Sequence, residues 1–138
     1  MNFKLLKIFL IPAFIGMSQV ASAQALLSNF EVQSQIELSF KYTEFPVKLD
    51  KITNITSIQT FGVRGLQYNY TLDLNISDLG DDVAINMTRD TIRNRASDGL
   101  CNNPAMVWHK ENFVELKYVY SDNVNTSIFE FKVNPNDC

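Results

Sequence analysis

The sequence predicts an α+β fold: an antiparallel β-sheet of about four strands, arranged as two hairpins, with helices packed on one face and one disulfide. Two observations lead to this expectation. Two parts of the chain, one near its middle and one near its C-terminal end, alternate apolar and polar residues with period two, as half-buried strands do. Between them lies a charged stretch of about 20 residues with the spacing of a helix. A sheet with one wet face and one helix-covered face accommodates both patterns.

The first 23 residues have the three parts of a cleavable export signal. Lys4 and Lys7 form a positive region, Ile8 to Val20 is almost entirely apolar, and Ala21-Ser22-Ala23 offers the small side chains that a signal peptidase accepts. The apolar run of about 13 residues falls short of the roughly 20 that span a bilayer. We therefore expect a signal peptide at residues 1–23, a single periplasmic or secreted domain at residues 24–138, and no membrane span after cleavage.

The segment from Gln24 to Phe45 is ambiguous from its pattern. Its apolar residues fall on even positions, as in a strand; they are Phe30, Val32, Ile36, Leu38, Phe40 and Tyr42. No equally good helical stripe can be drawn through it. Two hairpins, however, leave a sheet face that needs cover, which favours a helix here.

The first hairpin is predicted from Ile52 to Ile76. Ile52 to Phe61 is rich in β-branched residues, and Gly62-Val63-Arg64-Gly65 supplies a glycine-containing loop. From Leu66 to Ile76 apolar and polar residues alternate strictly. The polar members are a candidate binding face: Gln67, Asn69, Thr71, Asp73 and Asn75. The apolar members include Tyr68 and Tyr70, which we expect on the core side.

The central segment, Asp78 to Gly99, is predicted to be helical. Acidic residues at its start and arginines in its later turns suit the helix dipole. An apolar stripe is formed by Val83, Met87, Ile92 and Ala96. Gly99 is the expected stop, and Asn103-Pro104 is expected to begin a short helical turn that carries Trp108 and ends at Asn112.

A second hairpin is predicted from Phe113 to Val133. Val114, Leu116, Tyr118 and Tyr120 face one way in its first strand, and Phe129, Phe131 and Val133 do so in its second. Glu115, Lys117, Glu130 and Lys132 take the opposite face. A polar turn at Ser121 to Asn125 joins the two strands.

Charge and cysteine content limit the partners. Loss of Lys4 and Lys7 leaves 10 of the 12 basic residues against 15 acidic ones, a formal charge of −5 without a basic patch. Nucleic acid and anionic lipid are therefore poor partners. Cys101 and Cys138 allow one intramolecular disulfide in an exported protein; an intermolecular pair and two free thiols are the alternatives.

The sequence carries no catalytic or metal motif, and we expect no cofactor and no metal. His109 is the single histidine, so it cannot build a zinc site with appropriately spaced ligands. It is a candidate general base only if a nucleophile lies close in space. Five Asn-x-Ser/Thr triplets occur, at Asn54, Asn69, Asn75, Asn86 and Asn125. Glycosylation there would need a eukaryotic secretory route, whereas the signal has a bacterial character.

Several short motifs occur together in order: Phe45-Pro46, Asp50-Lys51-Ile52-Thr53, Leu66 to Leu72, Cys101-Asn102-Asn103-Pro104, Leu116 to Asp122 and Asp137-Cys138. With them the chain resembles a group of small exported proteins of Gram-negative bacteria, some described as a quorum-sensing-regulated virulence factor. The resemblance implies an N-terminal helix, an antiparallel sheet and a disulfide between Cys101 and Cys138. It implies no activity or cofactor. The turn at Asp122 to Asn125 departs from it, because an Asp-x-Asp-Gly turn is expected there.

These observations favour a non-enzymatic binding or accessory protein of the bacterial envelope, whose partner is an unknown protein or envelope component. A small hydrolase that uses His109 and a subunit of a surface or secretion assembly are the alternatives. The favoured class follows mainly from the scarcity of catalytic groups.

Overall fold

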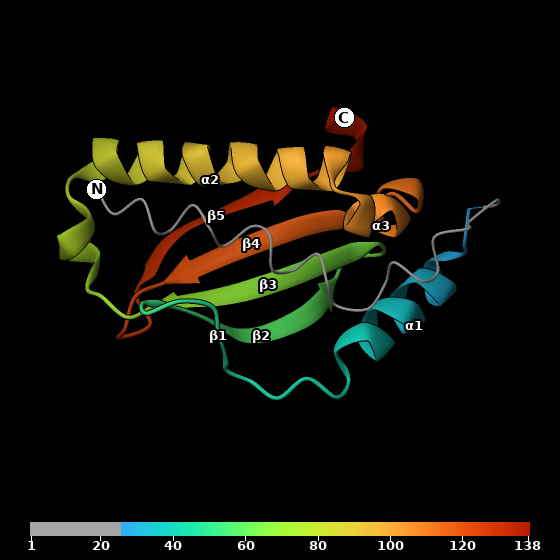
Figure 1. Ribbon diagram of the computed structural model, residues 1–138, viewed down its shortest axis with the longest axis horizontal. Coiled ribbons are helices and arrows are strands. Elements are labelled where there is room, and N and C mark those ends of the chain that lie inside the picture. The colour runs from blue at the N-terminus through green and yellow to red at the C-terminus, as the bar shows by residue number, and fades with distance from the viewer. Residues whose placement is uncertain (1–25) are drawn as a thin grey trace.

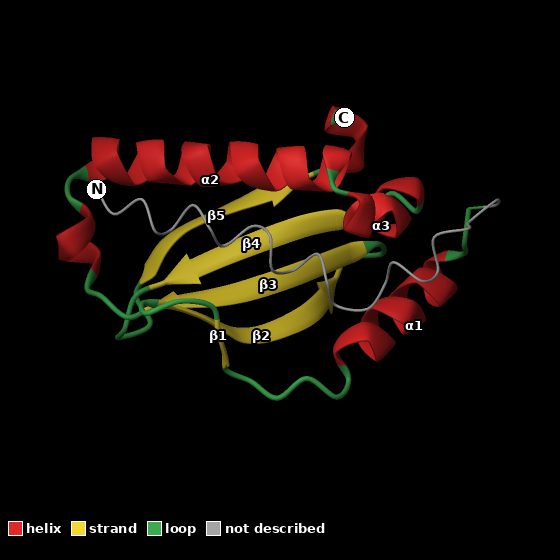
Figure 2. Ribbon diagram, viewed as in Figure 1, coloured by secondary structure: helices red, strands yellow, loops and turns green. Residues whose placement is uncertain are grey.

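The computed structural model describes residues 26–138, so the expected signal peptide and its cleavage site lie outside the described residues. Helix α2 and the short α3 lie over a twisted sheet, with α2 next to β5 and α1 next to β2 (Figure 1). The strands are β1 (Val47–Lys48), β2 (Thr53–Phe61), β3 (Gly65–Leu72), β4 (Glu115–Ser121) and β5 (Ser127–Val133). The helices are α1 (Asn29–Phe40), α2 (Asp82–Asn102) and α3 (Val107–Glu111). The α+β class is confirmed (Figure 2).

The sheet is mixed rather than antiparallel, and it has five strands in the order β1-β2-β3-β4-β5. The two predicted hairpins are present, but β3 and β4 pair in parallel, from Gly65 opposite Glu115 to Thr71 opposite Ser121. The helical connection explains this: α2 has 21 residues and carries the chain back along the sheet by about 30 Å. The next strand therefore starts at the same end as β3, as in other parallel pairs joined by a crossover helix.

One strand and one strand boundary also differ from the expectation. The short strand β1 was not predicted; it pairs Val47 with Ile55 at the edge of the sheet. Strand β3 ends at Leu72, whereas the alternation continues to Ile76. Beyond Leu72, Asn75 caps a short 3₁₀ helix at Ile76–Leu79, so the pattern there belongs to a turn.

Helix α2 begins later and ends later than predicted. Asp81 is its N-cap, accepting a hydrogen bond from the Ala84 N–H, and the helix runs through Gly99 to Asn102. Cys101 therefore lies in the last turn rather than beyond the helix. Its buried stripe has a spacing of four residues: Thr88, Ile92, Ala96 and Leu100. Of the four residues of the predicted stripe, Ile92 and Ala96 are buried, whereas Val83 and Met87 are exposed.

Helix α1 settles the ambiguous segment as a helix. Ser28 and Glu31 form a capping box at its start, which satisfies two backbone N–H groups. Val32 and Ile36, one helical turn apart, are fully buried and join the main core. The even-numbered alternation was misleading because Phe30 and Leu38 face solvent.

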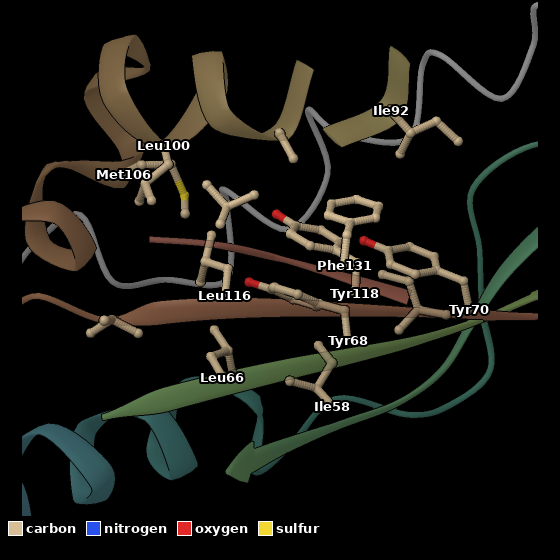
Figure 3. Packing of buried hydrophobic residues seen from close by; sticks show 14 of the residues in the cluster. Ile58, Leu66, Tyr68, Tyr70, Ile92, Leu100, Met106, Leu116, Tyr118 and Phe131 are labelled. Carbon is tan, nitrogen blue, oxygen red and sulfur yellow. The ribbon is translucent and has the colours of Figure 1, made fainter. Parts of the chain in front are cut away.

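The core is aromatic. Figure 3 shows Tyr68, Tyr70, Tyr118 and Phe131 rising from the strands towards Ile92 and Leu100 of α2. The rings of Tyr70 and Tyr120 stack with centroids 4.6 Å apart. Burial, followed by the charges of neighbouring tyrosines, raises the pKa of Tyr70 well above its usual value. These tyrosines therefore stay neutral and serve packing, as expected for the core side of the sheet.

Replacing Tyr120 with Phe is expected to leave the free energy of unfolding unchanged or to raise it by about 1 kcal/mol. The Tyr120 hydroxyl is buried and has no hydrogen-bond partner among the described residues, so its removal relieves a desolvation cost. Chemical denaturation measures the change, with Tyr42→Phe, at an 85 % exposed position, as the control. A loss of more than about 1 kcal/mol would show that the hydroxyl makes a stabilising bond.

Asp122 holds two loops together at one end of the sheet. Its Oδ1 accepts hydrogen bonds from the N–H groups of Val124 (3.0 Å) and Thr126 (2.8 Å), and its Oδ2 accepts one from Ile76 (3.2 Å). Burial alone would raise the pKa of this carboxyl, but these hydrogen bonds outweigh it and hold the pKa below its usual value. Asn125 adopts a φ of 63°, in the left-handed region that asparagine tolerates better than most residues do.

Candidate functional site

One face of the sheet is open. In all four long strands the residues of one face are buried, while those of the opposite face are half or fully exposed. Helices α1 and α2 both contribute to the core on the buried side. The open face consists of Ser57, Gln59, Gln67, Asn69, Thr71, Glu115, Lys117, Val119, Glu130 and Lys132.

The half of the open face over β2 and β3 is neutral and internally hydrogen-bonded. The Asn69 amide donates to Ser57 Oγ at 2.8 Å and to Gln59 Oε1 at 3.4 Å, and Gln67 Nε2 donates to Asn69 Oδ1 at 2.8 Å. The register places Ser57 opposite Asn69 and Gln59 opposite Gln67. These contacts fix the amide side chains in orientation, which lowers the entropy lost on binding a partner.

The half over β4 and β5 is charged. Lys117 lies 3.8 Å from Glu130, and Lys132 lies 3.6 Å from Glu115. Both lysines also approach the Phe61 ring, at 5.9 and 5.6 Å from its centroid. Exposed ion pairs of this kind contribute little to stability. Their alternation of sign makes the half suited to a polar partner rather than to an anionic polymer.

The structure places the predicted binding residues in two groups. Gln67, Asn69 and Thr71 lie on the open face, whereas Asp73 and Asn75 follow the end of β3. The Asp73 N–H donates to Ile52 O, and Asn75 caps the 3₁₀ helix, so both serve the local backbone. The sequence did not reveal Ser57 and Gln59, because only the β2–β3 register brings them beside Asn69.

His109 is unsuited to catalysis in this structure. It is 2 % exposed, and its Nδ1 has no hydrogen-bond partner among the described residues. Its ring packs edge-on against Trp108, which is itself fully buried, as expected for a core residue. Burial lowers the pKa of His109 to about 4. A general base needs contact with its substrate, so the hydrolase alternative finds no support here.

Two surface hollows lie elsewhere. One of about 520 Å³ is lined by Ser34, Glu37, Leu38, Phe40 and Lys41 of α1 and the residue after it. Another of about 240 Å³ lies between α2, β5 and the C-terminus and is lined by Arg93, Asn94, Ser97, Lys132, Val133 and Asp137. Across residues 26–138, no three His, Cys, Asp or Glu side chains are grouped so as to hold a metal ion. Over the same residues no helix is long and apolar enough to cross a bilayer.

Cys101 and Cys138 are joined in a disulfide, with their Cα atoms 5.4 Å apart. Together with the fold, this makes residues 26–138 a small disulfide-linked α+β protein. No protein-family model matches the chain, and no curated protein matches it. Among solved structures, a candidate secreted protein of Pseudomonas aeruginosa has a similar fold, with a TM-score of 0.64 and 16 % sequence identity. The match covers 83 % of this chain and 98 % of that one.

Proposed function

We propose that this chain is an exported, non-enzymatic binding or accessory protein of the bacterial envelope, and that it binds a protein partner through the open face of the sheet. The observation that carries the proposal is the preorganised network of Ser57, Gln59, Gln67 and Asn69 on a face that no described helix covers. The rims of protein–protein interfaces are likewise polar and rich in hydrogen-bonding groups.

Three features support the extracytoplasmic part of the proposal. The first 23 residues have the pattern of a cleavable export signal. Such a signal would direct the chain to a compartment in which disulfides form. The Cys101–Cys138 disulfide suits such a compartment. The similar Pseudomonas aeruginosa protein is described as a candidate secreted protein. On this basis we also propose membership of the Gram-negative exported group that the sequence resembles, with a single domain at residues 24–138.

The test is a pair of matched substitutions. Thr71→Arg places a long cation in the open face, whereas Thr91→Arg makes the same change on the exposed side of α2. Partners are captured from envelope extract with each variant and identified by mass spectrometry. We expect Thr71→Arg to weaken capture at least tenfold and Thr91→Arg to leave it unchanged, with equal unfolding midpoints for both.

Other results would redirect or reject the proposal. A partner captured equally by both variants would move the site away from the open face. Turnover in a broad hydrolase screen that disappears in His109→Ala would support the enzyme alternative. Capture of a set of envelope proteins in fixed stoichiometry would support the assembly-subunit alternative.

A further inference from the structure

Arg64 joins three segments of the chain at the end of the sheet where β3 and β4 begin, and exposed apolar residues lie next to it and to its partners in sequence. The Arg64 guanidinium donates hydrogen bonds to Leu27 O, to Asn29 Oδ1 at 2.7 Å and to Asn112 O at 2.8 Å. It thereby joins the start of α1, the β2–β3 turn and the end of α3, which lie together in Figure 1. A large exposed apolar residue adjoins each of these connected positions: Leu26, Phe30, Val63 and Phe113.

These four residues, here called the Arg64 patch, are 58, 78, 57 and 51 % exposed respectively. Taking about 200 Å² for a fully exposed aromatic residue, the two phenylalanines alone present about 250 Å². With Leu26 and Val63 the patch reaches the few hundred Å² that mark interaction sites on soluble proteins. That is close to the apolar part of one side of a standard interface, which buries about 800 Å² per partner.

Phe113, one member of the patch, has an unusual backbone conformation. Its φ is +52°, a region that a bulky side chain rarely adopts. The N–H of Val114 donates to His109 O and the N–H of Phe113 donates to Lys110 O, so α3 ends in a Schellman motif with Phe113 at the position that glycine usually fills. An exposed phenylalanine thus occupies a position where glycine would fit with less backbone strain, and residues in such strained conformations cluster at functional sites.

The charges around the patch point to its occupant. Arg64 bonds only to neutral oxygens, and no described carboxylate lies within ion-pair distance of it. Glu111 is exposed and adjoins Asn112, one of the residues that Arg64 contacts. The same surface therefore offers a cation without an ion-pair partner among the described residues, an exposed carboxylate and apolar side chains. A two-fold interface requires such self-complementarity.

We propose that the Arg64 patch is a homodimer interface, in which the apolar residues of two copies pack together and Arg64 of each copy pairs with Glu111 of the other. This surface is distinct from the open face of the sheet, so dimerisation and partner capture can succeed or fail separately. A dimer of this kind would present two open faces on one particle.

Sedimentation equilibrium of the exported protein, over a concentration series from about 1 to 500 μM, tests the proposal. We expect a monomer–dimer equilibrium that Phe30→Ser weakens at least tenfold. Leu38→Ser, a change of similar kind at a 61 % exposed position of the same helix, should leave it unaltered. Glu111→Lys should also weaken the dimer, because it places a second cation opposite Arg64.

Phe113→Gly separates an interface role from a structural one. Glycine removes the aromatic surface but relaxes the backbone at this φ, so the dimer should weaken at least tenfold while the unfolding midpoint of the monomer is not lowered. A monomer throughout the concentration series would overturn the proposal. So would a dimer that resists Phe30→Ser and Phe113→Gly, or one that Leu38→Ser weakens as strongly as Phe30→Ser does.

Discussion

Replacing both Cys101 and Cys138 with Ser is expected to lower the free energy of unfolding by about 3–4 kcal/mol. The reason is that the disulfide removes conformational entropy from the unfolded chain by closing a loop. The two cysteines are 37 residues apart in sequence, and the loop between them contains α3, β4 and β5. Circular dichroism of the double variant should still show the native mixture of helix and strand, because the core does not include the sulfur atoms. Urea denaturation measures the loss.

Reduction of the parent protein supplies the control. Dithiothreitol should lower the unfolding midpoint of the parent to that of the double Ser variant and should leave the variant itself unaffected. Equal stability of parent and variant without reductant, or thiols that titrate in the unreduced native protein, would contradict the structural role of this bond.

Lowering the pH from 7 to 4 is expected to remove about 3 kcal/mol of stability through His109 alone. Burial holds the folded-state pKa at about 4, against 6.5 for the unfolded chain. Between these values the unfolded state binds the proton and the folded state does not, so stability falls as the pH falls. The 2.5-unit difference corresponds to about 3 kcal/mol at 1.36 kcal/mol per unit. Well above pH 6.5 both states are neutral at this residue, so it contributes no pH dependence there.

His109→Phe isolates the contribution, since it keeps an aromatic ring beside Trp108 but does not titrate. The slope of stability against pH between 4 and 6.5 should disappear in this variant. Asp122 acts in a separate window: its pKa is lowered, so the stability it provides is present above its ordinary value of 3.8 and is lost as the pH falls below it. Retention of the parent slope in His109→Phe would show that another group titrates.

The strands and their buried faces were predictable because period-two alternation reports directly on burial. Tyr68, Tyr70, Tyr118 and Tyr120 were correctly placed on the core side, and Asn103 and Pro104 were correctly placed at the start of a helical turn. Both kinds of prediction rest on local chemistry. The alternation beyond Leu72 misled because a turn residue such as Asn75 is polar for a different reason, namely capping.

The direction of β4 relative to β3 was not predictable from local patterns. Two adjacent hairpins pack equally well in either sense, and the choice depends on the length and path of α2. The exposed residues of α1 were missed for a related reason. A helix that covers only part of a sheet needs just Val32 and Ile36 as buried contacts, which is too weak a stripe to compete with the alternation.

For the candidate site, sequence identified Gln67, Asn69 and Thr71 but not their partners on β2. The Arg64 contacts could not be predicted from the sequence either, because Leu27, Asn29 and Asn112 are 35 to 48 residues away from Arg64 along the chain. A glycine-flanked arginine in a turn gives no signal of such contacts.

The parallel pairing of β3 with β4, here called the seam, affects how the protein unfolds locally. Every pair across it joins residues 50 positions apart, as Gly65 opposite Glu115 and Thr71 opposite Ser121 show, whereas the hairpins on either side join near neighbours. Each hairpin can re-form locally after a fluctuation, but the seam cannot be restored until the whole helical connection is back in place. Amide protons at the seam should therefore exchange with solvent only through global unfolding, while those of β1 exchange through local fraying.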